Sequence, residues 1–327
     1  MMANPRVLRL PALSRPIDPV VPRRARAHVL AALQALLVTF LWSTSWVLIK
    51  IGLNDLILPP ITFAALRYAL AALVLMPLAL AALRRVPRTE LRSRTMVRVA
   101  LLGVLLYAVT QGAQYAALVH LPAVAVSLAL SATPVIVSVL ALRGSERATL
   151  VQLGGMLALV AGAALYFGPL PLGPDAYLGL AIIVVGVAAN AASALLGRAL
   201  ARDDLPNVGG TLGLTALSMA VGALVLLVVG LALEGLPALG VDEWLIVVWL
   251  ALVNTALAYT LWNHTLRTLT AVESSVLNNT MLIQIALLAW LFLGETLDAR
   301  QVVGLAIAFA GILAVQVTRR RSLPSLP

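Results

Sequence analysis

The sequence contains polar side chains suited to binding, but no grouping suited to catalysis or to metal coordination. There is no cysteine among its 327 residues, and its three histidines, His28, His120 and His264, lie far apart. Neither they nor the acidic residues are spaced as metal ligands are, so the sequence predicts no metal and no cofactor. No nucleophile with a neighbouring base is visible, which argues against an enzyme. The phosphate-binding pattern G-x-x-x-x-G-K-[ST] is absent, so ATP is not the expected energy source.

Arg67 lies inside a long apolar run, Ile61–Leu83, where a charge is unusual. A charged group within a bilayer is costly unless it is paired, so an arginine at this depth is expected to have a partner or a function. It could bind an anionic group such as a substrate carboxylate. It could equally be a structural arginine that bonds backbone carbonyl groups or extends towards the membrane surface. The sequence leaves both interpretations open.

Several other polar or aromatic residues recur at helical spacing within apolar runs. Gln111 and Tyr115 are four residues apart, as are Tyr259 and Asn263, so each pair shares one face of a helix. Such faces could line a central cavity or form hydrogen bonds between helices. Two tryptophans, again four apart, could wall the cavity or pack between helices. The candidate cavity residues are Trp42, Trp46, Arg67, Gln111, Gln114, Tyr115, Asn190, Asn254, Tyr259, Asn263, Asn278, Asn279 and Gln284.

Proton coupling would require a titratable group that both sides of a membrane can reach in turn. No acidic residue lies at the middle of an apolar run. Glu273, at one end of the run Val272–Leu293, is the nearest and is the candidate coupling residue. Glu146 and Glu295 fall in turns, where they are expected to bond backbone amides or arginines. Proton exchange through Glu273 and facilitated diffusion without a coupling ion both remain possible.

The composition identifies an integral membrane protein. The chain is 61% hydrophobic and only 11% charged, whereas about a quarter of the residues in a soluble domain are charged. A helix needs roughly 20 apolar residues to cross the hydrocarbon core of a bilayer. We predict an all-α protein with ten such helices. They are Val29–Ile49, Ile61–Leu83, Val97–Val119, Leu121–Leu142, Leu150–Phe167, Tyr177–Gly197, Val208–Leu233, Trp244–Asn263, Val272–Leu293 and Gln301–Val317.

The positions of the basic residues predict the orientation of these helices. If the N-terminus is cytoplasmic, all but three of the 23 basic residues fall on the cytoplasmic side, the exceptions being Lys50, Arg67 and Arg300. Both termini are then cytoplasmic, with basic tails at 1–27 and 319–327. A cleaved signal peptide is the alternative for the first tail, but no A-x-A-like cleavage site follows. The net charge of +10 is therefore a topology signal that also favours contact with anionic lipid, and nucleic-acid binding is not expected.

The ten predicted helices form two copies of one five-helix unit. The offset that places Glu146 on Glu295 also places Gly155 on Gly304 and Gly162 on Gly311. Because five is odd, the second unit (176–318) enters the membrane from the side opposite to the first (28–168), and the repeat is inverted. Inverted repeats are typical of secondary transporters that bind substrate near the midplane. The paired glycines, seven residues apart, predict close helix packing.

Three stretches resemble the EamA-like transporter family of the drug/metabolite transporter superfamily. They are FLWSTSWVLIKIGL (Phe40–Leu53), PPITFAALRYALAALVL (Pro59–Leu75) and LLAWLFLGETL (Leu287–Leu297). The resemblance implies ten helices, two cytoplasmic termini and export of small metabolites, amino acids or drugs. Members of this family often have an arginine at the position of Arg67, which favours a structural or gating role for it.

The resemblance also identifies one departure from the family pattern. The family usually has a proline in the middle of both the fourth and the ninth helix. Here Pro134 is present, but Leu282 or Ile283 occupies the matching place in the second copy. Pro134 is therefore a candidate hinge, and the two halves are not expected to bend equivalently.

The sequence as a whole predicts a multi-pass secondary transporter of a bacterial inner membrane. It would export a small organic metabolite, such as an amino acid or drug-like compound, by alternating access, with protons as a candidate coupling ion. The alternatives are a non-transporting membrane assembly or sensor partner and, less expected, an intramembrane enzyme. The sequence does not identify the substrate, the direction of transport or the oligomeric state.

Overall fold

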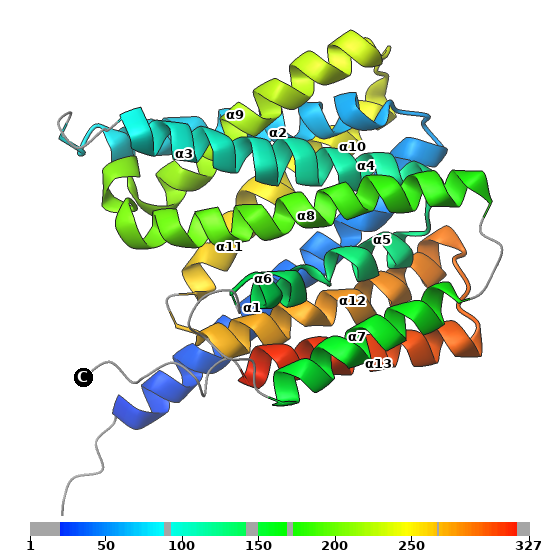
Figure 1. Ribbon diagram of the computed structural model, residues 1–327. Coiled ribbons are helices and arrows are strands. Elements are labelled where there is room, and N and C mark those ends of the chain that lie inside the picture. Colours follow the sequence, from blue (N-terminus) through cyan, green and yellow to red (C-terminus); the bar gives the residue numbers. More distant parts are fainter. Residues whose placement is uncertain (1–19, 88–92, 142–149, 169–172, 267, 319–327) are drawn as a thin grey trace, which may run out of the picture.

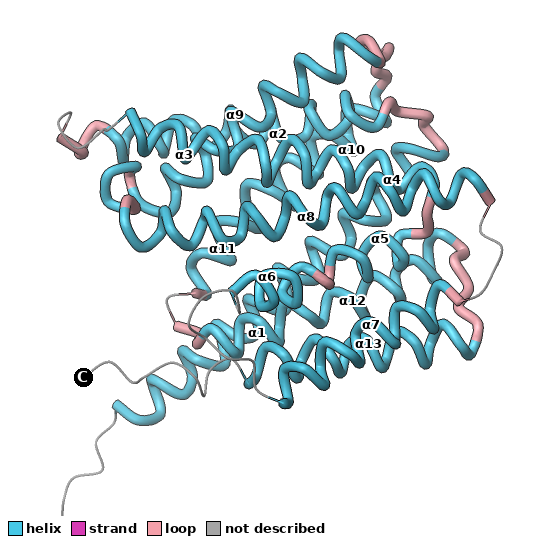
Figure 2. Tube along the Cα trace, viewed as in Figure 1, coloured by secondary structure: helices cyan, strands magenta, loops and turns pink. Residues whose placement is uncertain are grey.

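The computed structural model describes residues 20–87, 93–141, 150–168, 173–266 and 268–318. All regular structure in these ranges is helical, and Figure 2 contains no strand. The elements are α1 (Val20–Asn54), α2 (Pro60–Leu83), α3 (Ser93–Gly103), η2 (Val104–Gln111), α4 (Gly112–His120), α5 (Ala123–Leu130), α6 (Thr133–Ala141), α7 (Leu150–Phe167), α8 (Pro174–Asp203), η3 (Pro206–Val208), α9 (Gly210–Leu233), α10 (Val241–Ala251), η4 (Leu252–Leu257), α11 (Ala258–Thr265), α12 (Ala271–Leu293) and α13 (Ala299–Thr318).

The helices are long and apolar enough for a membrane protein. Seven helices of the described chain meet the length and hydropathy of a membrane span, and three shorter apolar helices accompany them, Ala123–Val137, Leu153–Phe167 and Ala299–Ala314. Large apolar side chains lie on the outside of the bundle, among them Leu157 and Phe292, which are 71% and 66% exposed. Contact of such an apolar surface with water would be unfavourable, whereas contact with lipid is not. The chain is a multi-pass membrane protein.

Several helices differ from the expected boundaries, and two of the differences change the predicted organisation. Helix α1 already begins at Val20, so residues 20–27 of the predicted tail are helical, while residues 1–19 and the tail 319–327 lie outside the described residues. The predicted helix Leu121–Leu142 is divided into α5 and α6 at Ser131 and Ala132. Pro134 explains the division, because proline has no N–H to donate and is best accommodated in the first turn of a new helix.

The predicted third and eighth helices each contain a π-helical segment, which the sequence did not indicate. Segment η2 begins at Val104, within the third helix, and η4 begins at Leu252, within the eighth, which is its counterpart in the second repeat. The wider π turn leaves carbonyl groups to be bonded in another way. Thr110 and Thr255 donate from Oγ1 to the carbonyls of Leu105 and Leu250, over 2.7 and 2.8 Å.

The helix contacts follow an internal two-fold relation between the repeats. Helices α2 and α9 occupy equivalent positions in the two copies and pack against each other, as do α7 and α13. Other contacts occur in related pairs: α1 packs against α12 as α8 packs against α5 and α6, and α4 packs against α8 as α11 packs against α1. In Figure 1, α7 and α13 run together along one side of the bundle.

Glycines bring α7 and α13 into backbone contact, as their spacing predicted. A Cβ atom on Gly162 would lie 2.5 Å from the carbonyl oxygen of Gly304, and one on Gly311 would lie 2.5 Å from that of Gly155. Real Cβ atoms do not approach so closely, so the helices can cross here only without side chains. Gly154, on the same helix, has no atom within 4 Å of its hypothetical Cβ.

We expect Gly162→Ala to destabilise the protein and Gly154→Ala to leave it unchanged. The added methyl group at Gly162 must separate α7 from α13, and overpacking of this kind usually costs about 1–3 kcal/mol. The thermal midpoint of the purified protein in detergent measures the difference. Equal midpoints for the two variants would contradict the proposed backbone contact.

Candidate functional site

A cavity of about 400 Å³ lies at the centre of the helix bundle, which is within the usual range for small-molecule sites. It is called the central cavity below. Its walls come from α1, α2, η2, α4, α5, α6, α8, α11 and α12, so both repeats contribute. Nine of the candidate cavity residues lie on these walls, together with Pro134. The nine are Trp42, Trp46, Arg67, Gln111, Gln114, Asn190, Tyr259, Asn278 and Asn279.

Four candidate residues do not line the central cavity: Tyr115, Asn254, Asn263 and Gln284. Asn254 donates from Nδ2 to the carbonyl of Leu41, and so ties η4 to α1. Gln284 accepts from Ser43 over 2.9 Å and donates to Thr280 over 3.2 Å. Both side chains form hydrogen bonds within or between helices, because a bilayer provides no water to bond buried polar groups. For Asn254 and Gln284, hydrogen bonding is thus the alternative that the geometry favours over cavity lining.

The Arg67 guanidinium is held by neutral partners from three helices. Its Nε donates to Thr255 Oγ1 over 2.9 Å, and its Nη1 donates to Tyr115 Oη over 3.2 Å. Its Cζ atom lies 5.1 Å from the ring centroid of Tyr68, in a cation–π contact. Thr255 can serve Arg67 because the π turn of η4 directs its own proton to the Leu250 carbonyl. The π segment therefore helps to position the charge.

One end of the guanidinium remains available to a ligand. Arg67 is only 4% exposed, yet its Nη2 forms no hydrogen bond within the described residues. This nitrogen is also not among the fully buried atoms without a partner. Because Arg67 lines the central cavity, a ligand in that cavity could reach the unpaired N–H groups of Nη2. A carboxylate placed there would receive charge-assisted hydrogen bonds.

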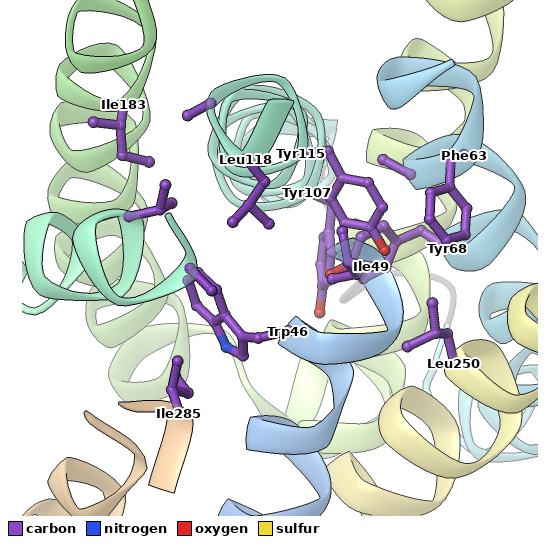
Figure 3. Close-up of a cluster of buried hydrophobic side chains, with 14 of the residues drawn as sticks. Trp46, Ile49, Phe63, Tyr68, Tyr107, Tyr115, Leu118, Ile183, Leu250 and Ile285 are labelled. Atoms are coloured by element: carbon purple, nitrogen blue, oxygen red, sulfur yellow. The ribbon is translucent and has the colours of Figure 1, made fainter. Parts of the chain in front are cut away.

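Four aromatic residues line the central cavity, Trp42, Trp46, Tyr68 and Tyr259, and other rings pack nearby. The ring of Trp42 lies 5.4 Å from that of Tyr259 and 5.3 Å from that of Trp262, measured between centroids. Figure 3 shows Tyr68, Tyr107 and Tyr115 gathered near Phe63, with Trp46 on the opposite side beside Ile285. Tyr68 also lines the cavity but was not among the candidate residues, because an aromatic residue in an apolar run gives no signal of its own.

Fully buried apolar residues lie to one side of the central cavity, on four of the helices that line it. Ile49, Leu118, Val124 and Ala289 have no exposed surface, and they are called the apolar plug below. On each of their helices the plug residue lies about one turn from a central-cavity residue: Ile49, Leu118 and Ala289 come after Trp46, Gln114 and Ile285, and Val124 comes before Ser127. A helical turn rises about 5.4 Å, so the plug is thin.

The other end of the central cavity reaches the surface. Asn278, two turns into α12, lines the cavity and is exposed. Ser131, Thr133 and Pro134 line the cavity at the division between α5 and α6, and Asn190 of α8 donates to Thr133 over 3.0 Å. The hydroxyl groups of Ser131 and Thr133 were missed in the sequence, because serine and threonine routinely bond carbonyls of their own helix.

Comparison with known proteins identifies the family. The model of the EamA-like transporter family matches residues 29–168 and again 177–316, and the two matches together cover most of the chain. The chain belongs to the EamA-like transporter family. The two matches coincide with the two repeats, so each repeat is one EamA unit.

Solved structures support the fold of this EamA-like chain and nothing more specific. One structure, described as "Crystal structure of protein", has a TM-score of 0.62 and 20% identity, and covers 89% of this chain and 99% of its own. A comparison with curated protein sequences yields no match. Within the described residues, no group of three histidine or acidic side chains is arranged to hold a metal ion.

Glu273, the candidate coupling residue, lies outside the central cavity of this EamA-like protein. It forms a capping box at the start of α12: its Oε2 accepts from Thr270 N over 2.8 Å, and Thr270 Oγ1 accepts from Glu273 N. Its Oε1 lies 3.1 Å from His28 Nε2. The hydrogen bonds from Thr270, and to a lesser degree the attraction of His28, lower the pKa of Glu273 below its ordinary value. Coupling through Glu273 remains a prediction.

We expect Glu273→Gln to lower stability near neutral pH but not in acid. A depressed folded-state pKa means that the carboxylate stabilises the fold above its unfolded pKa of about 4.3 and ceases to do so as the pH falls through the folded value. Thermal midpoints of wild type and variant should therefore converge as the pH falls below about 4. A constant difference at all pH values would contradict the capping role of the charge.

Proposed function

We propose that this protein is a secondary transporter that exports a small organic metabolite by alternating access. The observation that carries the proposal is the central cavity, which has polar walls and is built from both EamA units. The buried apolar plug on one side of it and the exposed Asn278 on the other support a cavity that opens to one side at a time. Alternating access requires a site of this kind that is exposed to one side at a time. Membership of a transporter family supports the same function.

The proposal includes ten membrane spans with both termini in the cytoplasm of a bacterial inner membrane. Seven long apolar helices and three shorter ones, in the predicted order, support this proposal. With this orientation the exposed end of the cavity at Asn278 faces the cytoplasm, and the plug faces outward. The described conformation is then the one that loads cytoplasmic solute.

The walls of the central cavity favour a solute with a carboxylate and an apolar or aromatic part. Arg67 Nη2 offers the charge, Trp42, Trp46 and Tyr259 offer ring faces, and amides such as Gln111 offer adaptable hydrogen bonds. Among the described residues that line this cavity there is no acid to balance a cationic solute. A carboxylate would complete the hydrogen bonding of Arg67.

Two other functions would leave the central cavity unused. A membrane assembly or sensor partner would show no solute movement, and an intramembrane enzyme would need a nucleophile and base that this cavity does not present among its described lining residues. Counterflow of radiolabelled metabolites in proteoliposomes separates these possibilities. Absence of counterflow across a broad panel of carboxylates, amino acids and neutral drugs would refute the transporter.

We expect Arg67→Ala to weaken counterflow of a carboxylate solute by about 10- to 100-fold in KM, because hydrogen bonds to a charged group are worth about 1.5–3 kcal/mol. Arg67→Lys keeps the charge but not the fork of donors, so it should lie between Ala and wild type. Arg85→Ala, an exposed change just beyond the end of the same helix, is the matched control. Wild-type KM in Arg67→Ala would contradict substrate binding by Arg67.

We expect single cysteines at Leu236 and Arg85 to be labelled from opposite sides of the membrane. The natural chain has no cysteine, and both positions are exposed, between α9 and α10 and just after α2 respectively. A membrane-impermeant maleimide added to intact cells should label Leu236→Cys, whereas Arg85→Cys should react only after the membrane is opened. The reverse pattern would overturn the proposed orientation.

A further inference from the structure

The central cavity contains one buried charge that no described residue balances. Arg67 is the only charged side chain among the described residues that line it. Its hydrogen-bond partners, Thr255 and Tyr115, are neutral, and it forms no ion pair in the described part of the chain. A buried charge without a counter-charge is costly for a fold, and more so within a bilayer. A ligand that carries one net negative charge would remove that cost.

The net charge of the solute therefore matters as much as the presence of a carboxylate. A monoanion leaves the filled central cavity neutral. A zwitterion brings its own ammonium group, so the filled cavity would hold two cations and one carboxylate. The described lining residues include no acid to pair with that ammonium, and Glu273, the candidate coupling residue, caps α12 instead. The charge balance of the cavity favours a monoanion over a zwitterion.

Gln114 is a second group in the central cavity that lacks hydrogen bonds. It lines the cavity and is 6% exposed, yet its side chain bonds to no other described residue. Neither its Oε1 nor its Nε2 is among the fully buried atoms without a partner, so a solute in the cavity could reach both. The hydroxyl groups of Ser127 and Thr110, on the same walls, donate to helix carbonyls. Buried polar groups normally have partners, and a solute would provide one for Gln114.

Gln114 and Arg67 can contact the same small solute. Tyr115, the residue after Gln114, accepts from Nη1 of Arg67 over 3.2 Å, and α2 packs against α4. The turn of α4 that holds the guanidinium therefore also carries the amide, and both groups line one cavity of about 400 Å³. An amide offers both donors and an acceptor but no charge. It suits a neutral polar group on the solute, such as a hydroxyl, a carbonyl or another amide.

We propose that the solute is a monoanion with a neutral polar group, bound by Arg67 and Gln114, and that the membrane potential alone drives its export. The inference rests on the proposed transport function and specifies its substrate class and its energy source. An inside-negative potential expels an anion through any pathway that carries it. A potential of about 100 mV supports a concentration ratio of about 50-fold for a monovalent anion. Export then needs neither ATP nor a coupling ion.

Three probes test the substrate class in counterflow. Hydrocinnamate, phenyllactate and phenylalanine share a carboxylate and a phenyl ring, and differ only in the hydrogen, hydroxyl or ammonium group beside the carboxylate. We expect phenyllactate to have the lowest KM and phenylalanine the highest. The hydroxyl should lower KM by roughly 3- to 10-fold relative to hydrocinnamate, because a neutral hydrogen bond contributes about that much.

Gln114→Met keeps a long unbranched side chain but removes its hydrogen-bonding groups. It should raise the KM of phenyllactate to that of hydrocinnamate and leave hydrocinnamate unchanged. Its thermal midpoint should stay at the wild-type value, because Gln114 has no bond within the described residues to lose. Gln284→Met is the matched control. Gln284 is bonded to Ser43 and Thr280 outside the cavity, so its loss should lower the midpoint and affect both probes alike.

The potential is tested in proteoliposomes with valinomycin and a potassium gradient, at about pH 7.5, where the probe carboxylate is ionised. An interior-positive potential of about 100 mV should accumulate phenyllactate towards 50-fold, and the reversed gradient should exclude it to the same degree. Both orientations of the protein give the same final distribution. Vesicles without the protein correct for leakage. A pH gradient applied at zero potential should produce no accumulation, whereas proton exchange through Glu273 would produce it.

The outcomes separate this inference from the transport function, because counterflow is an exchange that moves no net charge. Counterflow without potential-driven accumulation refutes the inference and leaves the transporter standing. Preference for phenylalanine over both anions, or equal effects of Gln114→Met on phenyllactate and hydrocinnamate, also refutes it. If another carboxylate moves in place of these probes, its response to the potential decides in the same way. Absence of counterflow for every solute removes the transporter itself.

Discussion

The architecture depends on one constraint: helices at equivalent places in the two repeats make direct backbone contact with each other. Gly162 and Gly304 allow α7 and α13 to touch, and Gly230 allows α9 to lie against Thr62 at the start of α2. In each case a helix packs against its own counterpart. These two contacts therefore fix one EamA unit relative to the other, and the central cavity is the space that remains between them.

Polar groups inside this bundle are hydrogen-bonded within the protein, because a bilayer provides no water to bond them. Almost every buried side-chain donor or acceptor of the described chain finds a partner, often on another helix, as Asn254 does with the Leu41 carbonyl. The two fully buried exceptions among the described residues are Oδ1 of Asn254 and Oε2 of Glu295. Nη2 of Arg67, which lines the central cavity, also forms no hydrogen bond within the described residues.

The two ends of the bundle are held by different interactions. At the end that carries Lys50, carboxylates of one repeat bond helix N-termini of the other: Glu234 holds α2 and Glu295 holds α5. At the opposite end, α12 is capped by its own Thr270 and Glu273. This end also joins the two repeats, because Oε1 of Glu273 lies 3.1 Å from Nε2 of His28 in the first repeat.

The sequence by itself determined the membrane class, the order of the helices, the repeat and the glycine contact, because hydropathy, offset and small-residue spacing are properties of the linear chain. It also found most of the polar cavity wall, since amides and charges are rare in apolar runs. It could not separate Gln111, on the wall, from Gln284, bonded to Ser43, because both alternatives place a polar residue on an inward helix face. Only the tertiary structure shows which helix faces line the central cavity and where the π-helical segments η2 and η4 lie. It also shows that Glu295 accepts a hydrogen bond from Ala123 of α5 through one of its two oxygens. These features depend on contacts between residues that are far apart in the sequence.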